Sequence, residues 1–278
     1  MSSQVDQTVV KTQKVWIYGV VFGLVLALSM LIHVPANWVL SHASIKNSLL
    51  EKGLIVEQVQ GSIWNGSLQL IYQPKLAAST KDQELGKINW QFKPMPLLWL
   101  DGAIAMQWQY QDSAITADID SSLLELKKVQ VRELAGAVKI PDAVPLLMNV
   151  LPPTMRRNMQ LLQTANGDSK ITQAQALIDL QLMQPVELQA QAQVIEFEFM
   201  GNRLPIIELD AEQAAGSSAL EVSLLSKAQN WNLQGLFSSA NWQDFSGELN
   251  LKAASSQDLP DWAFALRKKS DTHYFARF

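Results

Sequence analysis

The sequence predicts a mostly β protein, in which a single N-terminal transmembrane helix precedes an antiparallel β-sheet domain with a short helical insertion around residues 141–162. Three observations carry this prediction. Residues 15–34 form an uncharged apolar run, the residues after 53 alternate apolar and polar side chains, and the alternation stops in the proline-rich segment 141–162. This pattern is compatible with a curved sheet, a sandwich or an open groove.

The apolar run is long enough to cross a membrane. It contains no Lys, Arg, Asp or Glu, and twenty helical residues span roughly 30 Å, the thickness of the hydrocarbon core. Trp16, Tyr18 and Trp38 flank the run, where aromatic rings favour the headgroup region, so we expect them to be interface anchors. A cleaved signal peptide and a buried core helix are the alternatives. The run is longer than a signal-peptide core, and Val34-Pro35-Ala36 is a poor cleavage site.

The lysines around the run set the predicted orientation. Lys11 and Lys14 precede it, whereas only Lys46 follows within a comparable distance, which favours a cytoplasmic N-terminus. We therefore predict a single-pass inner-membrane protein with the bulk of the chain in the periplasm. Its expected parts are a cytoplasmic tail at 1–14, a transmembrane helix at 15–34, a juxtamembrane helical stalk at 35–53 and a periplasmic β domain at 54–278.

Period-two alternation marks the expected strands. It is clearest at 68–72, 88–92, 104–110 and 115–119, and it returns at 176–182, 186–194, 231–237 and 249–253, with a last strand at 272–278. Gln111-Asp112-Ser113 is expected to be a hairpin turn. At Val194-Ile195 the phase slips by one residue, which predicts a bulge or bend.

The segment 141–162 contains four prolines and lacks alternation. We expect a short helical connection there, with a helix after Pro153. This segment is the candidate boundary between two subdomains, and an insertion within one sheet fits equally well.

The composition points away from several functions. The net charge of −4 disfavours nucleic acid as a partner. The chain has no cysteine, and its three histidines (His33, His42 and His273) lack the close spacing of metal ligands. Phosphate-loop, nucleophile-elbow and dinucleotide motifs are absent from the sequence. We therefore predict a binding protein and no enzyme, with no catalytic residues, metal or cofactor.

Two tryptophan-containing motifs follow the apolar run. The first is Gly61-Ser62-Ile63-Trp64-Asn65-Gly66, and the second runs from Leu85-Gly86-Lys87-Ile88-Asn89-Trp90 through Pro96 to Gly102. Their order and spacing resemble the G-[ST]-hydrophobic-W-x-G element and the following strand-and-turn block of the type II secretion system protein N family. The resemblance extends from the membrane helix to about Tyr110.

The first motif makes physical sense as a strand–turn–strand corner. Gly61 and Gly66 permit tight or positive-φ backbone, and Trp64 can cover the end of a sheet. We expect a structural corner, with direct contact to a partner as the alternative role.

The resemblance implies a non-enzymatic accessory component of the machinery that exports folded proteins from the periplasm across the outer membrane. Its implied role is assembly or bridging, and its implied partners are inner-membrane secretion components and the outer-membrane channel, with membrane lipid around the helix. The alternative is an inner-membrane-anchored module that binds or transfers lipid in an open groove. A scaffold would pack its apolar strand residues into a dry core, whereas a lipid carrier would leave some of them lining a groove; the residues concerned are Ile104, Met106, Trp108, Ile178, Leu180 and Leu182.

Overall fold

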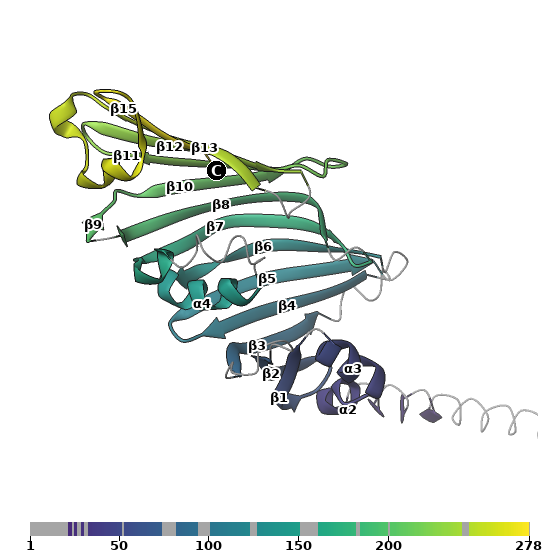
Figure 1. The fold of residues 1–278 in the computed structure, drawn as a ribbon. Helices are drawn as coiled ribbons and strands as arrows, with labels where there is room; N and C mark the ends of the chain where they lie inside the picture. The colour runs from purple at the N-terminus through teal and green to yellow at the C-terminus, as the bar shows by residue number, and fades with distance from the viewer. Residues whose placement is uncertain are drawn as a thin grey trace, which may run out of the picture.

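The alternating segments pair into one open antiparallel sheet of fifteen strands (Figure 1). The structure is a computed structural model that describes residues 22–23, 25–26, 29–30, 33–51, 53–73, 82–93, 101–122, 127–150, 161–181, 184–199, 201–240 and 245–277. A mostly β protein with an antiparallel sheet and few helices was predicted, and this part of the prediction is confirmed.

The strands follow one another in space almost as they do in sequence. They are β1 (Leu54–Gly61), β2 (Asn65–Tyr72), β3 (Gln83–Lys93), β4 (Asp101–Tyr110), β5 (Ser113–Ser122), β6 (Lys128–Lys139), β7 (Asn166–Asp179), β8 (Gln184–Phe199), β9 (Asn202–Arg203), β10 (Ile207–Gln213), β11 (Leu220–Lys227), β12 (Trp231–Ser239), β13 (Phe245–Ala253), β14 (Arg267–Ser270) and β15 (His273–Arg277). At the end of the sheet, β15 lies between β13 and β14, and the short β9 pairs with β8. Neighbouring strands are therefore joined by local connections.

The helices are short. They are α2 (Ala36–Leu40), α3 (Ala43–Glu51) and α4 (Ile140–Val150), with the 3-10 helices η2 (Leu161–Thr164), η3 (Ser256–Asp258) and η4 (Asp261–Ala265). Within the described ranges, no helix combines the length and the apolar character needed to cross a membrane. The predicted span at 15–34 lies mostly outside the described residues.

The predicted stalk consists of two helices instead of one. Ser41 and His42 separate α2 from α3, and both helices contact β1. Gly53 ends this segment with a φ of +74°, and its N–H donates to the Leu50 carbonyl at 3.0 Å, as expected of a glycine after a helix C-terminus.

The segment 141–162 is an insertion between adjacent strands, because β6 and β7 pair directly with each other. Its helix α4 begins at Ile140, earlier in the chain than we expected. The helix predicted after Pro153 falls largely on residues outside the described ranges. Pro141 suits the start of α4 because the first helical N–H groups lack partners in any helix.

Strand pairing sorts the alternating residues into two faces. Trp90 lies opposite Met106, and Met106 lies opposite Ala117, so these three share one face, whereas Asn89, Gln107 and Thr116 share the other. The same sorting continues to β13, because Leu209, Leu224, Gly235 and Leu249 are aligned across four strands. One face of the sheet is apolar and the other is polar.

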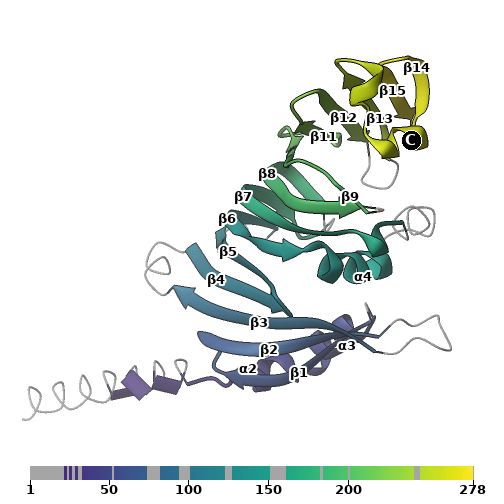
Figure 2. The same ribbon diagram turned by 90° about the vertical axis from the view of Figure 1, so that its left-hand side faces the viewer.

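Bulges add to the twist of the sheet. Gln58, Glu133 and Glu196 have φ near +50°, and each lies where the pairing register shifts. The shift at Glu196 includes Ile195, next to the phase slip predicted at Val194-Ile195. Bulges increase the local right-handed twist, and the strand directions rotate visibly from β1 to β13 (Figures 1 and 2).

The most deeply buried cluster lies at the C-terminal end of the sheet. Leu233, Leu251 and Ala263 form its centre, and Trp231 and Trp262 pack around them with ring centroids 5.8 Å apart. The helix η4 thereby covers the apolar face over β12 and β13. Elsewhere the apolar face carries mostly half-buried side chains.

Candidate functional site: the motif corner and the two sheet faces

The first motif forms a closed corner between β1 and β2. Ser62 N–H donates to the Asn65 carbonyl at 2.9 Å, and Ser62 Oγ accepts hydrogen bonds from the backbone N–H groups of Trp64 and Asn65 at 3.2 and 3.3 Å. The hydroxyl therefore holds the turn that presents Trp64. The Trp64 ring meets the Phe92 ring edge to face, with centroids 4.9 Å apart.

Both motif glycines lie where a side chain would collide. Gly61 has a φ of +83°, and a Cβ atom there would meet the Asn65 carbonyl oxygen. A Cβ atom on Gly66 would overlap the Trp90 ring and come within 2.6 Å of the Gln60 carbonyl oxygen. The two glycines thus allow the chain to reverse tightly beneath the indole ring of Trp90.

The second motif block closes over the first. Trp90 Nε1 donates to the Ile63 carbonyl at 3.1 Å, and Phe92 N–H donates to the Trp64 carbonyl at 2.6 Å. Sequence reasoning named Trp90 without finding this contact, which joins positions 27 residues apart. Gly102 stands apart from the corner in β4, where a Cβ atom would meet its nearest neighbour at 3.6 Å. Pro96 lies outside the described residues.

The chain enters the corner directly from the N-terminal segment. Ile63 N–H donates to the Val34 carbonyl at 3.1 Å, and Pro35 forms an isolated antiparallel bridge with Ser62. Trp38 is 70% exposed on α2. Trp16 and Tyr18 lie outside the described residues.

The apolar face begins at this corner and continues across the sheet. Its bulky side chains in β3, β4 and β5 are half-buried, and they are Ile88, Trp90, Phe92, Ile104, Met106, Trp108, Ile115 and Ile119. The dry core expected of a scaffold is therefore not found at Ile104, Met106 and Trp108. Leu180 lies beyond the end of β7 and is 43% exposed, Ile178 is half-buried, and Leu182 lies outside the described residues.

The helix α4 is fixed to this face by a buried hydrogen bond. Ser113 Oγ donates to Asp142 Oδ2 at 2.7 Å and accepts from the Lys139 N–H at 2.9 Å, and Ser113 is 1% exposed. In addition, the exposed Lys139 Nζ forms an ion pair with Asp112 at 2.7 Å. Sequence reasoning missed Ser113 and Asp142, although an acidic residue directly after Pro141 is typical of a helix N-terminus.

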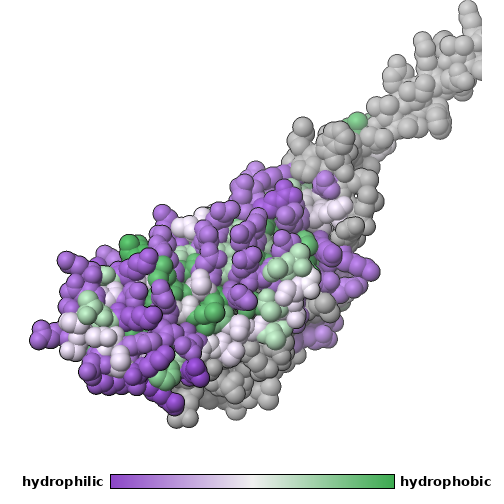
Figure 3. Space-filling view, turned by 90° about the horizontal axis from the view of Figure 1, so that it is seen from above, coloured by the Kyte–Doolittle hydropathy of each residue, from purple (hydrophilic) through white to green (hydrophobic). Residues whose placement is uncertain are grey.

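Charged residues concentrate on the polar face. Lys93 pairs with Asp118 at 2.6 Å across the small side chains of β4, and Arg132 pairs with Asp120 at 3.0 Å. Glu187, Glu208, Asp210 and Lys170 lie on the same face farther along the sheet. In the space-filling view from above, hydrophobic residues form patches bordered by hydrophilic ones (Figure 3).

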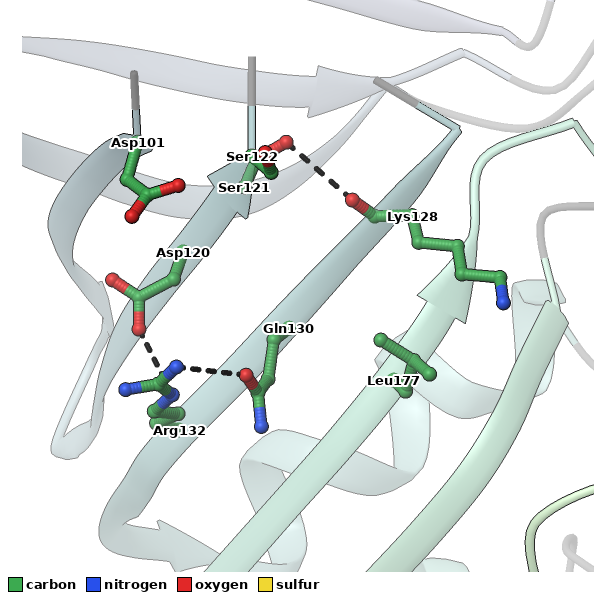
Figure 4. Close-up of a pocket in the computed structure, with 8 residues that line it drawn as sticks. All are labelled: Asp101, Asp120, Ser121, Ser122, Lys128, Gln130, Arg132 and Leu177. Atoms are coloured by element: carbon green, nitrogen blue, oxygen red, sulfur yellow. Dashed lines mark hydrogen bonds and ion pairs between the residues drawn. The ribbon is translucent and has the colours of Figure 1, made fainter. Parts of the chain in front are cut away.

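A hollow of about 530 Å³ opens at the strand ends on the polar face, and its lining includes Asp101, Asp120, Lys128 and Arg132. Asp120 and Gln130 both hold the Arg132 guanidinium, and the Lys128 ammonium points away from the two carboxylates (Figure 4). Because the guanidinium is already paired, this arrangement resembles a solvated ion-pair network. In the part of the chain that the structure describes, no group of three or more potential metal-ligating residues occurs.

Exposed ion pairs shift several pKa values modestly. Hydrogen bonding to Lys139 lowers the pKa of Asp112, and hydrogen bonding to Lys268 lowers the pKa of Asp271. Burial lowers the pKa of His273, and the positive charges of Lys269 and Lys252 lower it further. The shifts of Asp112 and Asp271 thus accompany exposed ion pairs, whereas that of His273 accompanies burial and nearby lysines.

One of the comparisons with known proteins identifies a family over most of the chain. The family model of type II secretion system (T2SS), protein N, matches residues 52–268, which include the motif corner and nearly the whole sheet. No match was found among curated proteins or solved structures. Because the family model covers more than half of the sequence, the chain belongs to the type II secretion system protein N family.

Proposed function

We propose that the protein is a non-enzymatic accessory component of type II secretion that bridges inner-membrane components and the outer-membrane channel. Family membership implies a role in type II secretion and an association with the cell envelope. The observation that carries the finer proposal is the length of the sheet. Fourteen strands lie in one pairing path, and at about 4.8 Å per step they extend roughly 60 Å.

The two ends of this sheet differ in a way that suits a bridge. At one end, the corner connects through Val34 and Pro35 to the apolar run that we propose crosses the inner membrane with its N-terminus in the cytoplasm. At the other end, β14 is the edge strand of the sheet. The corner would act structurally, by fixing the first strands to the membrane segment.

The bridging role requires the membrane end of the chain. We expect secretion of folded exoproteins to fall when residues 1–34 are replaced by a cleavable signal peptide, because the released domain no longer connects the two membranes. Exoprotein activity in the medium measures the effect, and immunoblotting confirms equal protein levels. An unrelated single-pass segment in place of residues 15–34 should restore secretion. Full secretion by the released domain would contradict the bridging role.

Lipid binding is a second candidate function, and one observation favours it. The apolar face of β3, β4 and β5 carries half-buried bulky side chains and no Asp, Glu, Lys, Arg or His in the described strands. Burying such a surface against an acyl chain would be favourable, at about 25 cal/mol per Å² removed from water. A bound lipid in the envelope could come from the surrounding membrane.

Met106 and Gln107 are consecutive residues of β4 on opposite faces of the sheet, and replacing each of them provides a test of lipid binding. The purified full chain should bind a fluorescent fatty acid saturably, and Met106→Asp should abolish binding because it places a charge on the apolar face. Gln107→Asp is the matched control on the polar face and should leave binding unchanged. Circular dichroism melting must show that both variants remain folded. Absence of saturable binding by the parent chain would exclude this function.

A further inference from the structure

Large exposed aromatic side chains lie only at the two ends of the described chain. Phe22 is 68% exposed within the proposed membrane segment and Trp38 is 70% exposed shortly after it, whereas Phe264 is 81% exposed at the far end. Every other described Trp, Tyr and Phe whose side chain is defined is at least half-buried. Figure 2 shows β14 and β15 at the end of the sheet opposite α2 and α3.

The exposure of Phe264 is fixed by the packing of its neighbours. Ala263 is 4% exposed in the C-terminal cluster, and Trp262 packs edge to face on Trp231. The Leu266 N–H donates to the Ala263 carbonyl at 3.0 Å, which completes the short helix η4. With its neighbours held against the sheet, Phe264 projects outward from a defined position.

Positive charge follows directly in the sequence. Arg267, Lys268 and Lys269 are exposed on the edge strand β14, and we call these three residues together with Phe264 the distal edge. Residues 260–277 carry four cationic side chains and two carboxylates, a net charge of +2, in a chain whose net charge is −4. Lys268 pairs with Asp271, whereas Arg267 and Lys269 have no ion-pair partner among the described residues.

We propose that the distal edge docks on a bilayer surface that contains anionic phospholipid. Phe264 enters the headgroup region, and the cations of β14 contact lipid phosphates, because aromatic and basic side chains together favour an anionic interface. Arg267 lies opposite Phe275 and Lys268 opposite Tyr274, so these two side chains point to opposite faces, and the pairing register shifts at Lys269. An edge-on approach therefore brings cations from both faces of β14 close to the surface.

Protection of the sheet edge does not explain the whole feature. Lysines on an edge strand oppose pairing with other chains. An exposed phenylalanine beside them has the opposite effect, because its apolar ring favours association. An acidic peptide that pairs with β14 would use the same cations, yet it gives no role to a ring that projects from η4. The bilayer accounts for both the ring and the charges. This inference is independent of the proposed bridging function.

The test uses the full chain inserted in phosphatidylcholine nanodiscs. The nanodisc covers the N-terminal apolar run, so this run cannot bind the liposomes. Flotation with liposomes should recover the protein when the liposomes contain phosphatidylglycerol, and not when they are pure phosphatidylcholine. Raising the salt from about 0.1 M to about 1 M should weaken binding, since the screening length falls from about 10 Å to about 3 Å.

Variants separate the two contributions. Arg267→Gln with Lys269→Gln should weaken binding by roughly thirtyfold, and Phe264→Ser by roughly tenfold. Lys87→Gln with Lys170→Gln is the control of equal charge on the polar face and should bind like the parent. Failure of the parent to float, equal loss in the control, binding unaffected by either distal-edge variant, or binding of an acidic peptide alone would each overturn the proposal.

Discussion

At the scale of single residues, the motif corner shows why particular residue types occur at fixed spacing. Gly61 needs a positive φ, and Gly66 leaves room for the Trp90 ring. Ser62 holds the turn through its hydroxyl, which lets Trp64 pack against Phe92. Each of these roles is local packing or backbone geometry, and none requires a partner protein.

Replacing Trp64 distinguishes a structural corner from a contact site. Trp64→Ala should lower the free energy of unfolding by about 2 kcal/mol, roughly half the loss for a fully buried aromatic ring, because Trp64 is half-buried. Urea denaturation measures the change. Trp38→Ala, at an exposed position on α2, should unfold like the parent. A fully stable Trp64→Ala protein that fails in secretion would favour direct contact with a partner.

The pKa of His273 gives a second expectation at this scale. Burial is the main cause of its lowered pKa, and the positive charges of Lys269 and Lys252 lower the pKa further. Because the pKa in the folded state lies below the ordinary value of about 6.5, the unfolded chain binds the proton more readily as the pH falls. The stability associated with neutral His273 is therefore complete above about pH 6.5 and is lost as the pH falls through the folded pKa.

The measurement is the melting temperature between about pH 7 and pH 5, which should decrease as the solution becomes more acidic. His273→Asn should reduce this pH dependence. The control His42→Asn, between α2 and α3, should retain it. An unchanged pH dependence in His273→Asn would show that another group is responsible.

At the scale of elements, α4 matters because it covers part of the apolar face, as η4 does at the C-terminal end of the sheet. Its first turn is held by the buried hydrogen bond between Ser113 and Asp142, and Val144 is 3% exposed. The sequence predicted a helical connection in this region but located its helix after Pro153. Proline content alone could not identify Asp142 as the attachment point, since Ser113 lies 29 residues earlier.

Removing the Ser113 hydroxyl should loosen this attachment. Ser113→Ala leaves the Asp142 carboxylate buried without its hydroxyl donor, which should cost roughly 1 to 3 kcal/mol. Hydrogen exchange should increase in α4 before it increases in β8. Asp112→Asn removes only the exposed ion pair with Lys139. It should leave the free energy of unfolding and the hydrogen exchange of α4 unchanged. Uniform destabilisation of the whole sheet would show that α4 is not a separate unit.

At the scale of the whole molecule, a single-layer sheet sets the relation between fold and function. Consecutive strand pairing fixes the position of the distal edge relative to the motif corner at the opposite end of the sheet. A sandwich of the same strands would bury the apolar residues and shorten the molecule. The open form instead leaves the apolar face, the polar face and the distal edge available for interaction, which suits an envelope component of a secretion system.

The sequence by itself determined the antiparallel pairing of alternating strands, the hairpin at Gln111 and Asp112, the glycine and tryptophan motifs and the family they indicate. These features depend on residues close together in the chain, where periodicity and turn chemistry act directly. Only the tertiary structure decided that the strands form one layer, that Trp90 bonds to Ile63, and that Ser113 holds Asp142. The physical reason is that a period of two fixes which side chains share a face, but it does not fix what packs against that face.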